Sequence, residues 1–170
     1  MTVYFSEKQR LSQIWIWIVL GLCALIPAWG IIQQLILKQP FGNQPMPDWG
    51  LILFALLMWG FIWFLGSMTL TTKLDRNGIQ FSLSPMVKKS FKWSEIDEYK
   101  IVNYGFVGGW GIRLTSTYGT IYNMAGKHGL FIKLKSGRKM VIGTQKPEKL
   151  ETFLKSRLTP DLMQRERLSD

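Results

Sequence analysis

Two long apolar stretches fill most of the N-terminal part of the chain. No charged residue occurs from Leu11 to Leu37, and none occurs from Trp49 to Thr72. At about 1.5 Å per residue, each stretch is long enough to cross a hydrocarbon core of roughly 30 Å. The sequence therefore predicts two transmembrane helices, over about residues 11–37 and 49–67.

The segment between the two stretches, residues 38–48, contains Pro40, Pro45 and Pro47. Prolines so close together break a helix, so the two spans are expected to form an antiparallel hairpin with a short loop. A cleaved signal peptide fits the first stretch less well, because the apolar run is too long and no small-x-small cleavage site follows it. A soluble protein of this size could not cover two helices that are apolar on all sides.

After Met68 the pattern becomes alternating, which is typical of half-buried strands. Six or seven short strands with hairpin-like spacing are expected, as in an antiparallel sandwich or barrel. The pattern then changes to helical spacing, with Leu150, Phe153, Leu154 and Leu158 on one face and Pro147 near the first turn. One amphipathic helix is thus expected at the end of the β domain. The alternating segments are TLTTKLD, IQFSLS, SFKW, EYKIVNY, IRLTST, TIYNMA, GLFIKLK and KMVIGT.

The amino-acid sequences of three segments also indicate a family. These segments are FKWSEIDEYKI (Phe91–Ile101), GGWGIR (Gly108–Arg113) and the run from Tyr122 to Leu150. They resemble the bacterial pleckstrin-homology-like (PH-like) domains that are attached to two transmembrane helices in membrane proteins. The resemblance implies a membrane α+β protein, in which the helical hairpin precedes a small antiparallel PH-like β-barrel with a C-terminal amphipathic helix. It also implies a membrane-tethered binding or scaffolding role.

The expected organisation has four parts. They are a cytosolic N-terminal tail (1–10), the transmembrane hairpin (11–67), the cytosolic PH-like domain (68–158) and a charged C-terminal tail (159–170).

The orientation follows from the distribution of charge. The chain carries 21 Lys and Arg against 11 Asp and Glu, and 18 of these cations lie after Met68. Basic segments beside transmembrane helices stay in the cytoplasm. We therefore expect a multi-pass protein of the cell inner (cytoplasmic) membrane, with both termini cytosolic and the loop 38–48 outside. The single cysteine, Cys23, lies in the first span and permits no internal disulfide.

The glycine-rich stretch YGFVGGWGIR (Tyr104–Arg113) invites comparison with phosphate-binding loops. A dinucleotide loop needs a third glycine where Leu114 stands, and a helix where an alternating, strand-like segment follows. The favoured explanation is mechanical: the glycines permit a sharp bend or bulge of the backbone. The alternative keeps Phe106, Trp110 and Arg113 as an exposed recognition tip.

Residues that could support catalysis are few. His128 is the only histidine, and the one carboxylate cluster is Glu95, Asp97 and Glu98. A metal cluster needs more ligands than these, and a catalytic site needs at least two convergent groups. The sequence therefore predicts a protein that is not an enzyme, with no cofactor and no metal.

Basic residues at the turns are the main candidates for binding, because each contributes on the order of 1 kcal/mol beside anionic headgroups. The expected function is a non-catalytic, membrane-tethered binding or scaffolding module for membrane lipids or a protein partner. The alternative is an accessory subunit docked through the hairpin on a larger membrane enzyme or transporter. The same cations could instead be solvated charges that only set topology, and dispersed lysines argue against nucleic acid. The candidate residues are Lys88, Lys89, Lys92, Arg113, Lys127, Arg138 and Lys139.

Overall fold

A computed structural model describes residues 3–105 and 109–156 of the chain. The chain divides into two compact units. One is helical and comprises Ser12–Ser67, and the other, called the β domain below, combines Met1–Leu11 with Met68–Asp170. The helical unit is therefore an insertion within the sequence of the β domain.

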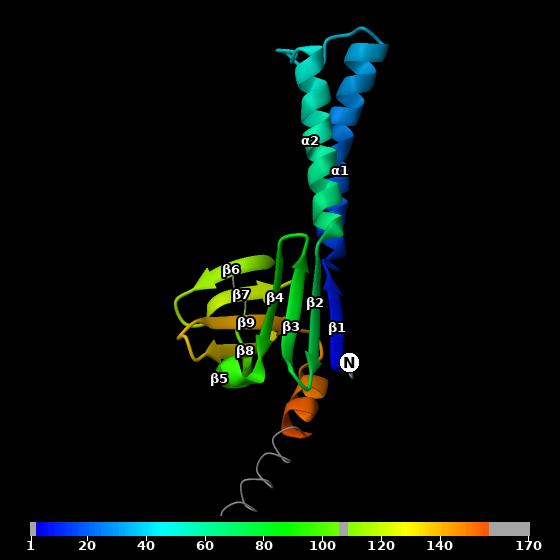
Figure 1. Ribbon diagram of the computed structural model, residues 1–170. Helices are drawn as coiled ribbons and strands as arrows, with labels where there is room; N and C mark the ends of the chain where they lie inside the picture. Colours follow the sequence, from blue (N-terminus) through cyan, green and yellow to red (C-terminus); the bar gives the residue numbers. More distant parts are fainter. Residues whose placement is uncertain (1–2, 106–108, 157–170) are drawn as a thin grey trace, which may run out of the picture. The chain divides into compact units, whose positions relative to one another are not determined.

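The helical unit is an antiparallel pair of helices (Figure 1). Helix α1 (Ile14–Ile31) continues into one turn of π-helix (Ile32–Ile36), and helix α2 (Asp48–Ser67) follows the loop. Ile14–Ile36 and Asp48–Ser67 are both long and apolar enough to cross a membrane, which confirms the expectation of two such helices. Leu51 and Ala55 of α2 are buried, whereas most of the large apolar side chains of both helices are exposed.

Two glutamines tie the end of the first helix to the loop. The Gln34 side-chain amide donates to the carbonyl oxygen of Met46 at 2.7 Å and to Oδ1 of Asp48 at 2.6 Å. Gln33 donates to the carbonyl oxygen of Pro40 at 3.1 Å. Each amide nitrogen therefore finds an acceptor within the helical unit.

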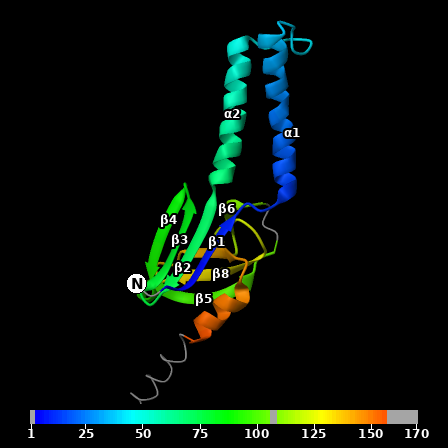
Figure 2. The same ribbon diagram turned by 90° about the vertical axis from the view of Figure 1, so that its right-hand side faces the viewer.

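The first sheet of the β domain contains β1 (Val3–Arg10), β2 (Thr69–Asp75), β3 (Gly78–Ser84) and β4 (Val87–Lys92). The strands pair in the order β1-β2-β3-β4, and each pair is antiparallel. Residues 3–10, expected to form a tail, are thus the first strand, beside β2 (Figure 2). The alternation was hidden because two inward positions of β1 carry polar side chains, Glu7 and Gln9.

The second sheet is mixed. It contains β5 (Ile96–Asn103), β6 (Gly111–Thr115), β7 (Gly119–Asn123), β8 (His128–Leu134) and β9 (Lys139–Thr144). The strand order is β5-β8-β9-β7-β6, in which only the β7–β9 pair is parallel. Consecutive strands β5 and β6 therefore lie at opposite edges of this sheet.

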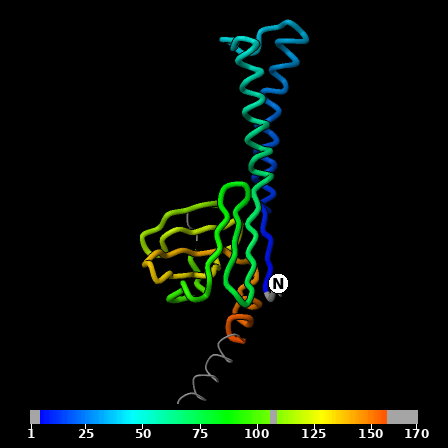
Figure 3. The backbone as a smooth tube through the Cα atoms, viewed as in Figure 1, coloured from blue at the N-terminus to red at the C-terminus, as the bar shows by residue number. Residues whose placement is uncertain are grey.

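The expected closed barrel is not found, because the strands that the structure describes form two separate sheets. The strands of the second sheet run across those of the first, as the backbone tube also shows (Figure 3). Phe81 of β3 and Tyr122 of β7 meet between the sheets, with ring centroids 4.8 Å apart. The residues most completely removed from solvent include Leu70, Leu74, Ile79, Leu83, Leu130, Ile132 and Ile142.

The second sheet also has a buried cluster formed by Tyr104, Ile121, Phe131 and Val141. Because side chains alternate between the faces of a strand, this cluster lies on the opposite face from Tyr122. Both faces of the central strands are therefore apolar, which explains why β8 and β9 lack a clean alternation.

Residues 147–156 are helical, which confirms the expected C-terminal helix over that range. Its first turn includes a hydrogen bond from the backbone N–H of Leu150 to the carbonyl oxygen of Lys146. Leu150 and Leu154 are buried, whereas Glu151 and Lys155 on the other side are exposed and form an ion pair of 2.7 Å. Leu158 and the tail 159–170 lie outside the described residues.

Candidate anion-binding face

The outer face of the four-stranded sheet gathers positive charge. Alternation along β1, β2 and β4 places five exposed cations on this face, which we call the cationic face. Serine, threonine and glutamine side chains fill the positions between them. The five cations are Lys8, Arg10, Lys73, Lys88 and Lys92.

The strand register arranges this face in rows. In the first row Arg10 pairs with Thr69, and Thr69 pairs with Ser84. The second row runs Lys8, Thr71, Ser82, Lys88, and the third runs Ser6, Lys73, Gln80, Ser90. Successive rows are about 7 Å apart, because a strand rises about 3.4 Å per residue. Lys92, opposite Gly78, belongs to a fourth row.

The first row is the one joined to the helices. Three residues, 11–13, separate Arg10 from the start of α1, and Met68 alone separates α2 from Thr69. These covalent links keep Arg10 and Thr69 within a few residues' length of the helix ends.

The acidic residues of the four strands are few and are engaged in hydrogen bonds. The four strands carry two acidic residues, Glu7 and Asp75. Asp75 ends β2, where its Oδ1 accepts from the backbone N–H groups of Asn77 and Gly78 at 2.8 and 2.9 Å. Among the residues that the structure describes, none of the five cations has an ion-pair partner. Their charge is therefore available to a ligand.

Glu7 anchors β1 from the opposite side of the sheet. Its carboxylate accepts from the Thr144 hydroxyl at 2.5 Å, from the backbone N–H of Gln145 at 2.7 Å and from the Gln9 side chain at 3.1 Å. Gln9 also donates to the carbonyl oxygen of Gly143 at 2.8 Å. Glu7 and Gln9 are both nearly fully buried, so this network ties the first strand to the end of β9 and fixes the cationic face in place.

The expected basic candidates of β4 lie on two different faces of the sheet. Lys88 and Lys92 lie on the cationic face, but Lys89 points to the other side of β4. There its ammonium donates to the Tyr122 hydroxyl at 2.9 Å and lies 5.4 Å from the centroid of the same ring. Lys8 and Arg10 were not among the expected candidates, because residues 1–10 were not recognised as a strand. A strand assignment for VYFSEKQR would have placed both on one face.

The glycine-rich connection between β5 and β6 contains Trp110, and Arg113 follows it in β6. Both are partly buried, and Gly109 has a φ of 135°. A Cβ atom at Gly109 would come within 2.3 Å of the Arg113 Nη2, so no other residue fits here without displacing that side chain. This packing agrees with the mechanical explanation of the glycines. Phe106, the other half of the expected recognition tip, lies outside the described residues.

The remaining basic candidates lie in turns of the second sheet. Lys127 is exposed between β7 and β8, and Arg138 and Lys139 are exposed at the β8–β9 turn. Arg138 Nε donates to the Ser136 hydroxyl at 3.4 Å. These three are therefore not part of the cationic face.

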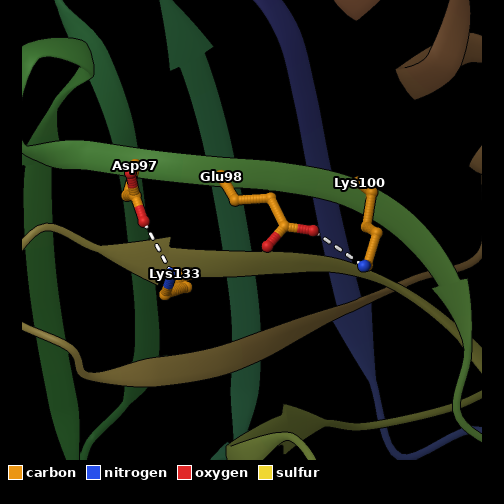
Figure 4. Close-up of polar contacts among 4 residues, drawn as sticks. All are labelled: Asp97, Glu98, Lys100 and Lys133. Carbon is orange, nitrogen blue, oxygen red and sulfur yellow. Dashed lines mark hydrogen bonds and ion pairs between the residues drawn. The ribbon is translucent and has the colours of Figure 1, made fainter.

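The expected carboxylate cluster takes part in local contacts of the second sheet. Asp97 and Lys133 form an ion pair of 2.7 Å across β5 and β8, and Glu98 and Lys100 form another of 2.7 Å along β5 (Figure 4). The hydrogen bond and positive charge of Lys133 lower the pKa of Asp97, and Asp97 raises the pKa of Lys133. Glu95 accepts from the backbone N–H of Lys92 at 2.8 Å.

The described residues, 3–105 and 109–156, hold no group of three or more His, Cys, Asp or Glu that is suited to a metal ion. No protein-family model, curated protein or solved structure matches this chain. The fold and site therefore define a protein with two apolar helices inserted in a two-sheet β domain, and its PH-like assignment stays a prediction.

Proposed function

We propose that this chain is a two-span protein of the cell inner (cytoplasmic) membrane, and that its β domain is a non-catalytic binding module at the cytosolic side. The exposed apolar side chains of both helices support insertion, because large apolar surfaces are costly in water and suited to lipid. The pairing of β1 with β2 also fits two spans, since it needs the chain on either side of the hairpin to be on one side of the membrane.

Anionic lipid headgroups are the proposed ligand of the first two rows of the cationic face. The observation that carries this proposal is that, among the residues that the structure describes, Arg10 of the first row and Lys8 and Lys88 of the second have no acidic ion-pair partner. Electrostatic attraction to a membrane falls off within a Debye length of about 8 Å. Along the chain, the first row is about 7 Å from the end of α2 and the second row is about 7 Å further, whereas Lys92 lies about 20 Å from the first row.

Lysine acylation of the full-length chain in nanodiscs tests the proposal. A water-soluble reagent is applied to protein in zwitterionic discs and in discs that contain anionic phosphatidylglycerol, and modified lysines are quantified by mass spectrometry. Lys8 and Lys88 should become protected by anionic lipid, while Lys92, on the same face, should react equally in both. Equal reactivity of all three lysines in both kinds of disc would refute headgroup binding and favour an accessory subunit that uses only its hairpin.

A further inference from the structure

The centre of the cationic face is hollowed into a groove of about 300 Å³. Strands β2, β3 and β4 line it, so it lies between the edge strand β4 and the middle of the sheet. The outward-pointing residues of its lining are Thr71, Lys73, Gln80, Ser82, Lys88 and Ser90.

The two lysines approach the groove from opposite sides. Lys73 lies on β2, Lys88 lies on β4, and the intervening strand β3 places Gln80 and Ser82 between them. Lys73 and Gln80 share the third row, whereas Ser82 and Lys88 share the second. A ligand above β3 can therefore meet both ammonium groups, a hydroxyl and an amide at once.

The chemistry of this lining selects an anion with several acceptor oxygens. Ammonium groups only donate hydrogen bonds, and hydroxyl and amide groups can all donate. Among the residues that the structure describes, no acidic side chain lines the groove. We propose that it binds a phosphate monoester, whose charge of about −1.5 to −2 at pH 7 matches two lysines and whose three terminal oxygens match the neutral donors.

This inference extends the proposed function and shares Lys88 with it, but Lys73 belongs to the groove alone. Lys73 lies in the third row, about 14 Å from the row joined to the helices, where attraction to the bilayer surface is largely screened. A change at Lys73 should therefore remove the groove ligand and leave the headgroup contacts of Lys8 intact. The monoester can come from a soluble molecule or from a lipid such as phosphatidic acid.

Phosphorus NMR of the full-length chain in maltoside micelles, which contain no phosphorus, tests the groove. Inorganic phosphate and glycerol 3-phosphate are titrated, with the diester dimethyl phosphate as the singly charged comparison. We expect saturable binding of both monoesters and much weaker binding of the diester. Lys73→Gln and Lys88→Gln should each lower the affinity by about tenfold or more, because each removes a charged hydrogen-bond donor.

Lys92→Gln is the matched control, since it removes the same charge from the same face but outside the groove. It should change the affinity by less than about twofold, and Lys73→Arg, which keeps the charge, should retain binding. Equal losses of affinity in all three Gln variants, or a response that does not saturate, would overturn the proposal. The phosphate would then be attracted only by the net charge of the face.

A second arm identifies the source of the phosphate. Acylation of Lys73 is measured in nanodiscs with phosphatidic acid and in discs with phosphatidylglycerol. Protection by phosphatidic acid alone assigns a lipid monoester, and protection by added glycerol 3-phosphate alone assigns a soluble one. If Lys73 is protected by neither, the groove proposal fails, whatever the reactivity of Lys8.

Discussion

Arg10, the last residue of β1, is the ladder partner of Thr69, the first residue of β2. The 58 residues between them include the whole helical unit, so the apolar hairpin takes the place of the tight turn that usually joins two antiparallel strands. The β domain is therefore complete only when the segment before the hairpin and the segment after it come together.

This relationship predicts that a short turn can replace the hairpin. A chain in which Asn-Gly joins Leu11 to Met68 should be soluble, monomeric and cooperatively folded, because Asn-Gly favours the type I′ turn of a two-residue hairpin. Size-exclusion chromatography and circular dichroism would show this. A chain that starts at Met68 lacks β1 and should aggregate. Equal behaviour of the two chains would contradict the role of β1.

Glu7 is predicted to be a main stabilising residue of the β domain. Glu7→Ala leaves the Thr144 hydroxyl and the Gln145 N–H without their acceptor, at a cost of about 3 kcal/mol in the free energy of unfolding. Urea unfolding of the turn-replaced chain measures this cost. In the full-length chain, the amide of Gln145 should also exchange faster with solvent.

Lys8, the exposed neighbour of Glu7, provides the control for this measurement. Lys8→Ala should change the free energy of unfolding by no more than about 0.5 kcal/mol. A Glu7→Ala variant as stable as Lys8→Ala would show that the buried network contributes nothing to stability.

Membrane insertion predicts resistance of the chain to carbonate extraction and opposite locations for reporters fused at Asn43 and at the C-terminus. Leu57 lies near the middle of α2 and its side chain is 64% exposed, so it should face lipid. Leu57→Arg should therefore raise the insertion free energy by about 2.5–3.5 kcal/mol and reduce the inserted fraction. Gly42→Arg, in the loop, should not. Release of the unaltered chain by carbonate would exclude a transmembrane hairpin.

The Asp97–Lys133 ion pair predicts a titration shift that NMR can measure. The pKa of the Asp97 carboxyl should lie below its usual value of 3.8, chiefly because Lys133 donates a hydrogen bond to it. Lys133→Gln should move this pKa back toward 3.8, and Lys100→Gln, which breaks the neighbouring pair, should affect it much less. Because both groups are exposed, high salt should also weaken the shift.

The ion pair makes the stability of the folded state depend on pH, with opposite signs at low pH and at high pH. A lowered Asp97 pKa contributes stability that is present above pH 3.8 and is lost as the pH falls through the folded value. A raised Lys133 pKa contributes stability that is present below pH 10.5 and is lost as the pH rises through its folded value. An Asp97 pKa that does not respond to Lys133→Gln would contradict the pairing.

Local signals in the sequence predicted much of the fold. Uncharged runs located both apolar helices, and the alternating segments TLTTKLD and IQFSLS located β2 and β3. The first strand was missed because its inward residues Glu7 and Gln9 are polar, and their partners at Gly143 and Thr144 are more than 130 residues away in the chain. No local pattern reveals an acceptor network of that kind.

The arrangement of the strands in sheets was harder to predict from the sequence. The expected barrel is replaced by two sheets, since β7 pairs in parallel with β9 and the second sheet carries apolar residues on both faces. The cationic face could not be predicted from the sequence for the same reason. Composition identified lysines at the turns, but only the register shows that Lys88 shares a row with Lys8 while Lys89 turns toward Tyr122.

The most direct test of the account measures how close the first row of the cationic face lies to lipid headgroups. Single spin labels at Ser84, in the first row, and at Ser90, in the third, are compared in full-length Cys23→Ser protein in nanodiscs that carry a gadolinium-chelating lipid. We predict stronger relaxation at Ser84 than at Ser90. Added anionic lipid should increase the relaxation at Ser84, and Lys8→Gln with Lys88→Gln should remove that increase. Equal relaxation at the two sites, or relaxation at Ser84 that ignores anionic lipid, would contradict the account.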